Sequence, residues 1–328
     1  MVIAGGAGRP RAFGLERGPH RLQIYLPIAD LPVNIFLVLG MGLAVGFISG
    51  MFGIGGGFLM TPLLIFIGIS PAVAVASVAS HIAASSFTGA ISYWRKRALD
   101  VALAMMLLSA GIVGTAVGVW LFTKLRELDQ LDLMIGLSYV TLLTAVGGMM
   151  IYESVRAELR ARRGMPATLR RPGSHTWLHG LPFKLRFKRS KIYVSAIPVW
   201  AIGFTIGFIG AIMGIGGGFL LVPMLIYFLR VPTATVIGTS MVLTLVTMAS
   251  ATVMHAATNH LVDAILALIL MVGGVIGAQF GVRTGQKMRG ERLRLLLGLL
   301  VFAVGLRFAY ELVVSPDDPF SLRHVGAE

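Results

Sequence analysis

The chain has no cysteine and few charged residues. Without cysteine it has neither disulfide bonds nor thiolate metal sites, and its redox compartment cannot be read from the sequence. Charged residues make up 13% of the 328 residues, about half of their share in soluble domains. Hydrophobic residues make up 56%, and the mean hydropathy is +0.84. Apolar runs of about 20 residues, the length that crosses a bilayer, recur along the chain. The composition therefore predicts an all-α polytopic membrane protein embedded in a lipid bilayer.

Acidic side chains are also scarce inside the apolar runs. The acidic residues nearest to the apolar runs lie close to the predicted ends of these runs. They are Asp100, Asp132, Glu153, Asp263 and Glu311. Carriers of metal cations usually need carboxylates within the membrane, so this scarcity favours an anionic substrate. His255 and His260 are five residues apart, which is not a helical ligand spacing. No metal site and no cofactor is therefore expected.

About eight segments are long and apolar enough to be spanning helices. They lie at about 33–52, 71–94, 101–123, 131–154, 192–213, 232–256, 261–283 and 293–314. Two shorter apolar pieces, at 58–69 and 219–229, cannot cross a membrane alone at 1.5 Å per residue. We expect these two pieces to be re-entrant segments or the second halves of broken helices.

The heptapeptide GIGGGFL occurs twice, at residues 53–59 and 214–220, and a proline follows each copy at the same distance. Glycines further along also align between the two halves, for example Gly114 with Gly277. Similar composition alone would produce scattered matches of leucine and valine, not aligned glycines and prolines. The chain is therefore expected to contain two homologous repeats of five segments each.

Loop charges indicate that the two repeats have opposite orientations. The loop after the third segment carries Arg95, Lys96 and Arg97, whereas the equivalent loop of the second half has no Lys or Arg. The next loop reverses this bias, because 124–129 is neutral overall and 283–294 is basic. Basic loops face the cytoplasm, so this pattern predicts two inverted-topology repeats.

The most basic stretch, residues 156–191, holds eleven Lys or Arg and one Glu. Such a stretch between spanning helices is typical of a cytoplasmic loop near anionic lipid headgroups, so no nucleic-acid partner is expected. The predicted organisation is an N-terminal tail at 1–23, disordered or not native, a first transmembrane repeat at 24–155, this loop at 156–191, a second transmembrane repeat at 192–314 and a C-terminal tail at 315–328.

Each glycine cluster interrupts an apolar run, although glycine in a helix costs about 1 kcal/mol relative to alanine. A break at membrane depth is tolerated only where its backbone groups meet protein, water or a ligand. The short helix after each break begins with N–H groups that lack partners and carry partial positive charge, which suits an anion. The expected substrate-binding glycines are Gly55, Gly56, Gly57, Gly216, Gly217 and Gly218. The alternative is that these glycines only allow close helix packing.

His81 is the ionisable residue closest to the middle of a predicted span, which makes it a candidate for proton coupling. The alternative is a neutral imidazole hydrogen-bonded between helices. Ser77 lies on the same helical face as His81, and Ser80 lies off that face. The equivalent helix of the second half offers Thr239 and Ser240. We expect all five residues to line the cavity, although hydroxyl side chains in membrane helices often bond only their own backbone.

The doubled GIGGGFL with its trailing proline, together with Gly238, Thr239 and Ser240, resembles the TauE/SafE sulfite exporter family, as does VGGVIGAQFG at 272–281. The resemblance runs from about residue 24 to 314. It implies a secondary transporter of anions, such as sulfite or organosulfonates, in a bacterial inner membrane. It also suggests that residues 1–22 come from a start codon placed too early. Many members of that family carry amide side chains where this chain has Ser80 and His81.

These features predict a carrier of a small oxyanion that works by alternating access, with a midplane site at the paired glycine breaks. A passive anion channel with the same site is the main alternative, and a membrane scaffold is another. An intramembrane enzyme is not expected, because the sequence offers no convincing acid–base pair, nucleophile or metal constellation. The sequence leaves open which ion, protons included, is coupled to transport and whether the protein forms a homodimer.

Overall fold

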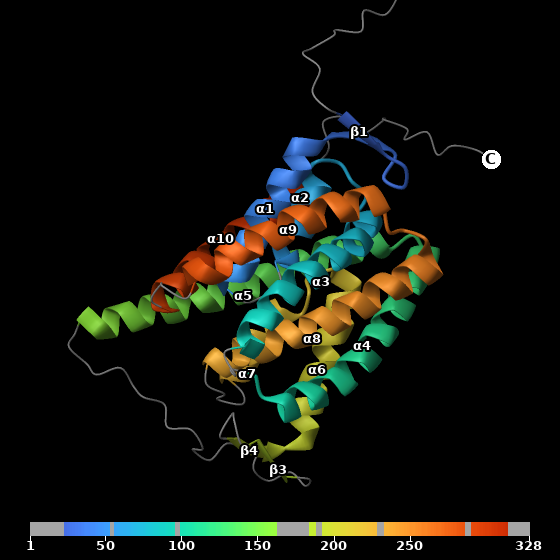
Figure 1. Ribbon diagram of the computed structural model, residues 1–328. Helices are drawn as coiled ribbons and strands as arrows, with labels where there is room; N and C mark the ends of the chain where they lie inside the picture. Colours follow the sequence, from blue (N-terminus) through green and yellow to red (C-terminus); the bar gives the residue numbers. More distant parts are fainter. Residues whose placement is uncertain are drawn as a thin grey trace, which may run out of the picture.

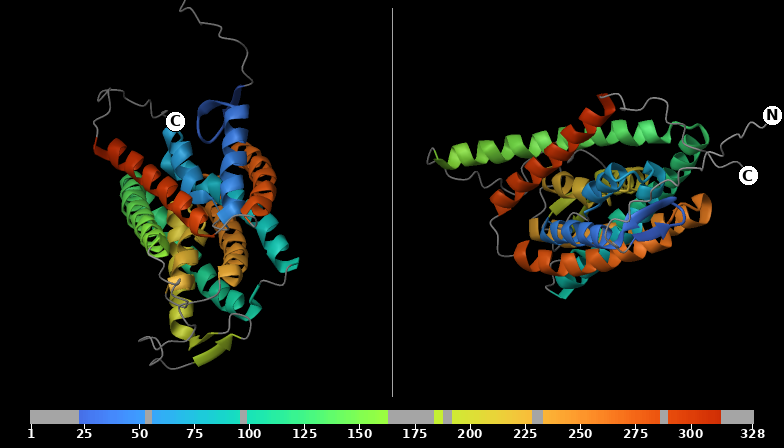
Figure 2. Two further views of the ribbon diagram at one scale, coloured as in Figure 1. Left: turned by 90° about the vertical axis from the view of Figure 1, so that its left-hand side faces the viewer. Right: turned by 90° about the horizontal axis from the view of Figure 1, so that it is seen from above.

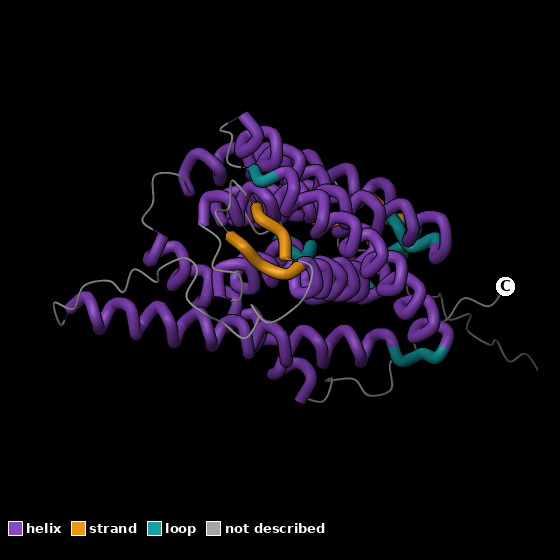
Figure 3. Tube along the Cα trace, turned by 90° about the horizontal axis from the view of Figure 1, so that it is seen from below, coloured by secondary structure: helices purple, strands orange, loops and turns teal. Residues whose placement is uncertain are grey.

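The computed structural model is a bundle of α-helices with two small hairpins (Figures 1 and 3). It describes residues 23–52, 56–95, 99–162, 184–187, 192–227, 233–285 and 290–313. The prediction of an all-α polytopic membrane protein is confirmed. Residues 1–22, Gly55, most of the predicted cytoplasmic loop and all of the predicted C-terminal tail lie outside the described residues.

The helices follow the predicted segments closely. The first half contains α1 (Ile35–Phe52), α2 (Gly57–Phe66), α3 (Pro71–Arg95), α4 (Val101–Glu127) and α5 (Leu131–Arg162). The second half contains α6 (Ala196–Met213), α7 (Gly218–Tyr227), α8 (Thr233–Met254), a π-helical turn (His255–Asn259), α9 (Ala264–Gly285) and α10 (Gly290–Val313). The two short pieces after the glycine breaks are ten-residue helices, α2 and α7. Helix α5 continues to Arg162, so the predicted boundary at 155 falls inside a helix.

Seven helices are long and apolar enough to cross a membrane, within the part of the chain that the structure describes. They are α1, α3, α4, α5, α6, α8 with its π turn, and α9. The eighth expected span, 293–314, corresponds to α10, of which Leu295–Tyr310 forms a shorter apolar helix within the described residues.

An antiparallel hairpin precedes the first helix of each half, and the sequence did not lead us to expect either one. The first pairs β1 (Gln23–Leu26) with β2 (Leu31–Asn34), and the second pairs β3 (Lys184–Phe187) with β4 (Ile192–Ser195). The spans expected to begin at 33 and 192 therefore begin as helix at Ile35 and Ala196. A side-chain cap sets each start, because Asn34 accepts from the N–H of Phe36 and Ser195 accepts from the N–H of Ile197.

Each half packs its first helix against the fourth helix of the other half. Helix α1 lies along α9, and α6 lies along α4. Helices α3 and α8 pack on each other and are the most buried of the candidate spans. Helices α5 and α10 form a separate pair on one side of the bundle (Figure 2). If each helix is replaced by its equivalent in the other half (α1 by α6, α3 by α8, α4 by α9, α5 by α10), the same set of helix pairs results.

Glycines bring the backbones of these pairs into direct contact. A Cβ added at Gly46 of α1 would lie 2.6 Å from the Cα of Gly274 in α9. One added at Gly118 of α4 would lie 2.7 Å from the carbonyl oxygen of Phe208 in α6. In both pairs a side chain at the glycine would push the two helices apart, so packing explains these scattered glycines.

Candidate functional site

The two glycine breaks lie against each other in the interior of the bundle. A Cβ added at Gly57 would collide with the carbonyl oxygen of Gly214 and would lie 2.9 Å from the carbonyl carbon of Ile215. The hydroxyl of Thr61, in α2, donates a hydrogen bond to the same Gly214 oxygen at 3.3 Å. The rings of Phe58 and Phe219 stack with their centroids 4.9 Å apart. Two motifs far apart in the sequence therefore form one structural unit.

Gly56 and Gly217, equivalent residues of the two breaks, have similar backbone conformations. Gly56 has φ 66° and Gly217 has φ 57°, in the left-handed region that glycine adopts without strain. The carbonyl of Gly56 accepts from the N–H groups of Leu59 and Met60, which starts α2. The carbonyl of Gly217 accepts from the N–H groups of Leu220 and Leu221 near the start of α7. Gly56 and Gly217 thus each provide the carbonyl that begins the hydrogen bonding of the short helix after the break.

The first N–H groups of α2 are not used within that helix, whereas in α7 the N–H of Gly218 donates to the carbonyl of Gly216. An α-helix does not use its earliest N–H groups internally, and in α2 these belong to Gly57 and Phe58. In this conformation the space between the breaks is filled by Ile82 of α3. The Cγ2 of Ile82 would lie 2.6 Å from a Cβ at Gly216, and its Cδ1 would overlap one at Gly57. Gly57 and Gly216 are therefore both closely packed against Ile82. Gly218 is the first residue of α7.

Ser49 is a polar neighbour of this unit that the sequence analysis did not single out. It is fully buried in α1, and its hydroxyl has no hydrogen-bond partner among the described residues. Its Cβ would lie 2.8 Å from a Cβ at Gly56. The equivalent position of the second half is Gly210, which faces the N–H of Gly217. The signal that could have revealed Ser49 is this single serine in one repeat where the other has glycine.

Ser77 and His81 do not face the glycine breaks; they face α9. The hydroxyl oxygen of Ser77 accepts from the N–H of Asp263 at 3.0 Å. His81 Nδ1 lies 2.7 Å from the carbonyl oxygen of Leu270, and the imidazole packs against Gly274. The expected common face of Ser77 and His81 is therefore real, and it is the face that joins α3 to α9.

The remaining predicted hydroxyl residues differ in how they are satisfied. Ser80 donates to the carbonyl of Ser77 at 2.6 Å, and Ser240 donates to the carbonyl of Ile237 at 2.8 Å. Both bonds stay within their own helix, as is usual for serine in membrane helices. Thr239 is fully buried, and its hydroxyl has no partner within the described chain. Of these three, only Thr239 keeps an unused hydrogen-bonding group.

The hydrogen bond of His81 defines its tautomer. A backbone carbonyl oxygen can only accept, so Nδ1 carries the proton and donates to Leu270. Nε2 then holds a lone pair in a fully buried ring and has no hydrogen-bond partner among the described residues. A buried polar atom without a partner is uncommon and requires an explanation, such as a functional role or an unseen ligand.

His255 gives a contrasting case in the same bundle. Its Nε2 lies 3.2 Å from the carbonyl oxygen of Ala211, so Nε2 carries the proton. Its Nδ1 accepts from the amide nitrogen of Asn259 at 3.2 Å. The ring also meets Phe122 edge-on, with centroids 4.6 Å apart. Both nitrogens of His255 are therefore satisfied, which identifies it as a structural histidine.

The two buried aspartates cap helices, as expected from their positions near the ends of predicted spans. Asp100 accepts from the N–H of Leu103 at the start of α4. Asp263 accepts from the N–H groups of Ile265 and Leu266 at the start of α9, and from Ile28 in the turn of the first hairpin. Their carboxylates stabilise helix starts, and the described parts of α1, α2, α3, α6, α7, α8 and α9 contain no Asp or Glu.

Comparison with known proteins identifies the family. The model of the sulfite exporter TauE/SafE family matches residues 38–308. The probable membrane transporter protein YunE of Bacillus subtilis is 21% identical over 291 residues, covering 86% of this chain and all of its own. A probable membrane transporter protein of Xylella fastidiosa is 29% identical over 283 residues, covering 83% of this chain and 94% of its own.

A plant protein matches more locally. Sulfite exporter TauE/SafE family protein 1 of Arabidopsis thaliana is 43% identical over 60 residues, which cover 18% of this chain and 13% of its own. No solved structure matches the chain. The family match over most of the chain and the seven apolar helices agree with each other. The chain is a multi-pass membrane protein that belongs to the sulfite exporter TauE/SafE family of membrane transporters.

Proposed function

We propose that the protein is a secondary carrier of a small anion, namely sulfite, an organosulfonate or a related oxyanion, across the bacterial inner membrane. One observation carries the proposal: the two GIGGGFL breaks lie against each other, with Gly57 on Gly214 and Phe58 stacked on Phe219. Each break starts a short helix whose first N–H groups favour negative charge. Two such helix starts in one buried unit suit a single anion between them.

The charge of the surrounding helices supports an anion over a cation. The helices that form and surround the breaks have no carboxylate in their described parts, and their only Lys or Arg residues are Arg95 and Arg283 at helix ends. A metal cation would find no oxygen anion there to replace its hydration shell. The free hydroxyls of Ser49 and Thr239 can donate to an oxyanion instead.

The two halves supply a mechanism for moving the site between the two sides. The crosswise packing of α1 on α9 and of α6 on α4 is what two interlocked, equivalent repeats would produce. Together with the opposite loop charges, it supports inverted-topology repeats. Ile82 fills the space between the breaks in this conformation, so a ligand can enter only when the two halves separate. Alternating access by movement of one half against the other satisfies this requirement.

The test is counterflow of radiolabelled sulfite into proteoliposomes loaded with unlabelled sulfite, with equal pH on both sides. A carrier gives a transient, saturable uptake above that of protein-free vesicles, and unlabelled sulfonate in excess competes with it. A channel gives uptake that does not depend on internal sulfite. A thermal-shift series with sulfite, methanesulfonate, sulfate and acetate locates the preferred class, because a ligand that binds only the folded state raises the Tm. Absence of both counterflow and thermal stabilisation by every anion would refute the proposal.

A further inference from the structure

The buried imidazole of His81 carries one lone pair that nothing in the described structure uses. We propose that Nε2 of His81 binds a proton that crosses the membrane together with the anion. This inference rests on the proposed anion transport and adds the coupling ion and the relative direction of the two fluxes.

His81 is next to the glycine breaks without being part of them. The following residue, Ile82, reaches both Gly57 and Gly216. Adjacent Cα atoms are 3.8 Å apart, so the backbone of His81 lies within a few ångströms of the residue that fills the space between the breaks. The ring itself turns the other way and lies on Gly274 of α9. A charge on the ring and a charge at the breaks would therefore interact across a short distance in a medium that screens weakly.

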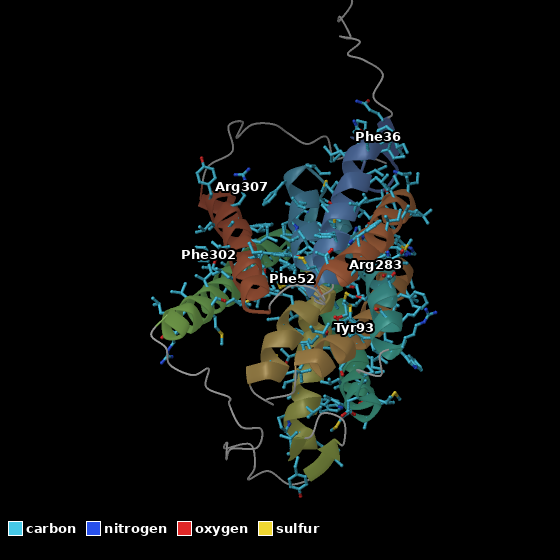
Figure 4. The ribbon with its side chains drawn as sticks, turned by 60° about the vertical axis from the view of Figure 1, so that its left-hand side comes forward. Phe36, Phe52, Tyr93, Arg283, Phe302 and Arg307 are labelled. Atoms are coloured by element: carbon cyan, nitrogen blue, oxygen red, sulfur yellow. The ribbon has the colours of Figure 1, made fainter. Side chains whose placement is uncertain are left out.

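The helices that pack on α3 offer no other uncommitted titratable side chain near His81. Helices α1, α2, α6 and α8 contain no charged or titratable residue at all. Helix α9 contains only Arg283, nine residues beyond Gly274 and therefore about 14 Å further along the helix. Figure 4 shows Arg283 near Phe52, at the end of the α1–α9 pair that is distant from Phe36 and the first hairpin. On α3 itself the other such residues are Tyr93 and Arg95, in its last turn.

The remaining neighbours are already engaged or remote. The carboxylate of Asp263, before α9, accepts three backbone N–H groups. Tyr139 of α5 donates its hydroxyl to the carbonyl of Met213 at 2.6 Å. The other titratable residues of α5 lie in its first turn or from residue 152 onward, and they are Asp132, Tyr152, Glu153, Arg156, Glu158, Arg160 and Arg162. His81 is thus the titratable residue beside the breaks whose protonatable nitrogen has no partner among the described residues.

The absence of a partner charge determines how proton and anion combine. An imidazolium at this position would be a buried cation without a carboxylate beside it, which is unfavourable. An anion at the breaks would be equally uncompensated, because no Lys or Arg side chain lies in the middle of these helices. Each charge reduces the penalty of the other, so the state with both bound crosses faster than a state with only one of them bound. The fluxes of proton and anion therefore run in the same direction.

The proton balance of one cycle is complete without another reactant. On one side, water supplies a proton and a bond forms between it and Nε2, giving an imidazolium while the anion binds. Nδ1–H continues to donate to the carbonyl of Leu270. On the other side the Nε2–H bond breaks, the proton returns to water and the anion leaves. A monoanion and one proton carry no net charge, so this exchange does not respond to the membrane potential.

The experiment measures accumulation of radiolabelled sulfite in proteoliposomes with the outside one pH unit more acidic than the inside and with the potential clamped to zero. The matched variants are His81→Gln, whose amide can still donate to Leu270, and His255→Gln, which alters the other buried histidine. We expect the native protein and His255→Gln to accumulate the hydrogensulfite monoanion up to about tenfold, because one proton accompanies each monoanion down a gradient of one pH unit. We expect His81→Gln to retain counterflow at equal pH, slower than that of the native protein because the anion crosses without a proton, and to lose accumulation, with an unchanged Tm.

Several outcomes would overturn the inference, and they are distinct from failure of the proposed function. Counterflow without accumulation by the native protein would leave a carrier that does not move protons. Accumulation by His81→Gln at the native level, or its loss in folded His255→Gln, would remove the role from His81. Loss of both counterflow and accumulation in folded His81→Gln would make His81 a binding residue and not the proton site. Absence of counterflow in the native protein would instead contradict the proposed anion carrier itself.

Discussion

Phe58 and Phe219 are equivalent residues of the two GIGGGFL motifs, and their rings stack at 4.9 Å with an interplanar angle of 16°. Both side chains are almost fully buried. Equivalent residues of two repeats can touch only where the two halves meet on the axis that relates them. Under the proposed alternating access, the halves would move about this contact.

This stack predicts a measurable coupling between the two halves. Phe58→Ala and Phe219→Ala should each lower stability by about 3–5 kcal/mol, the usual range for truncating a buried phenylalanine. The double variant should lose about 0.5–1.5 kcal/mol less than the sum of the single variants, because the ring–ring contact is counted twice in that sum. Thermal or denaturant unfolding in detergent micelles measures all three. Phe36→Ala, whose ring is 64% exposed, is the matched control and should change stability little. Strict additivity would contradict the coupling.

Gly57→Ala tests the contact between the breaks. The new Cβ would collide with the main-chain carbonyl of Gly214, which cannot move as a side chain could. We expect a fall in Tm and loss of sulfite counterflow. Gly40→Ala is the control, since a Cβ at Gly40 would meet no atom within 4 Å, and alanine should leave both properties unchanged or slightly improve helix stability. A folded, fully active Gly57→Ala variant would show that the two breaks need not touch.

Ser49→Ala separates a ligand role from a structural one. Because the hydroxyl has no partner in the described structure, its removal should leave stability equal or slightly higher. If Ser49 donates to the anion, the apparent affinity for sulfite should fall about fivefold to tenfold, the usual effect of one lost hydrogen bond of about 1 kcal/mol or slightly more. Ser86→Ala is the matched control, because that hydroxyl is also buried and unpartnered. Equal affinity in the native protein and Ser49→Ala would exclude Ser49 from the site.

Asp263→Ala tests the carboxylate cap that joins the start of α9 to the first hairpin. The carboxylate accepts from Ile28, Ile265 and Leu266, so its removal should cost about 1–2 kcal/mol of stability, as for other N-caps. Exchange of the Ile28 amide proton should accelerate in hydrogen-exchange experiments. Glu127→Ala removes a carboxylate of an exposed ion pair with Lys124 and should change stability by well under about 1 kcal/mol. Similar stability losses in both variants would contradict a specific cap.

Much of the architecture could be predicted from the sequence because it depends on local properties. Hydropathy and length locate α1, α3, α4, α5, α6, α8 and α9, since each must match the bilayer by itself. The glycine breaks and the short helices α2 and α7 follow from consecutive glycines and the flanking prolines. Asp100 and Asp263 fall at helix starts because capping is a short-range interaction. The hairpins were not predicted because each of their strands has only four residues, too few for a clear alternating pattern.

The candidate site was less predictable, because its contacts join distant parts of the chain. Ser77 and His81 share a helical face, as their spacing indicates, but only the packing of α9 on α3 decides that this face meets Asp263 and Leu270. Ser49 attracted no interest in the sequence, because a single serine in an apolar helix is common. Its significance comes from the close approach of α1 to Gly56.

By itself, the sequence determined that this protein crosses a membrane repeatedly, that it contains two copies of one motif, and that its interior is almost free of charge. Those properties follow from composition and periodicity, which act within each segment. Only the tertiary structure decided that the two motifs touch, that α1 pairs with α9 and α6 with α4, and that His81 donates through Nδ1 while Nε2 remains unused. These three features depend on close contacts between segments far apart in the chain, and no local sequence pattern specifies such contacts.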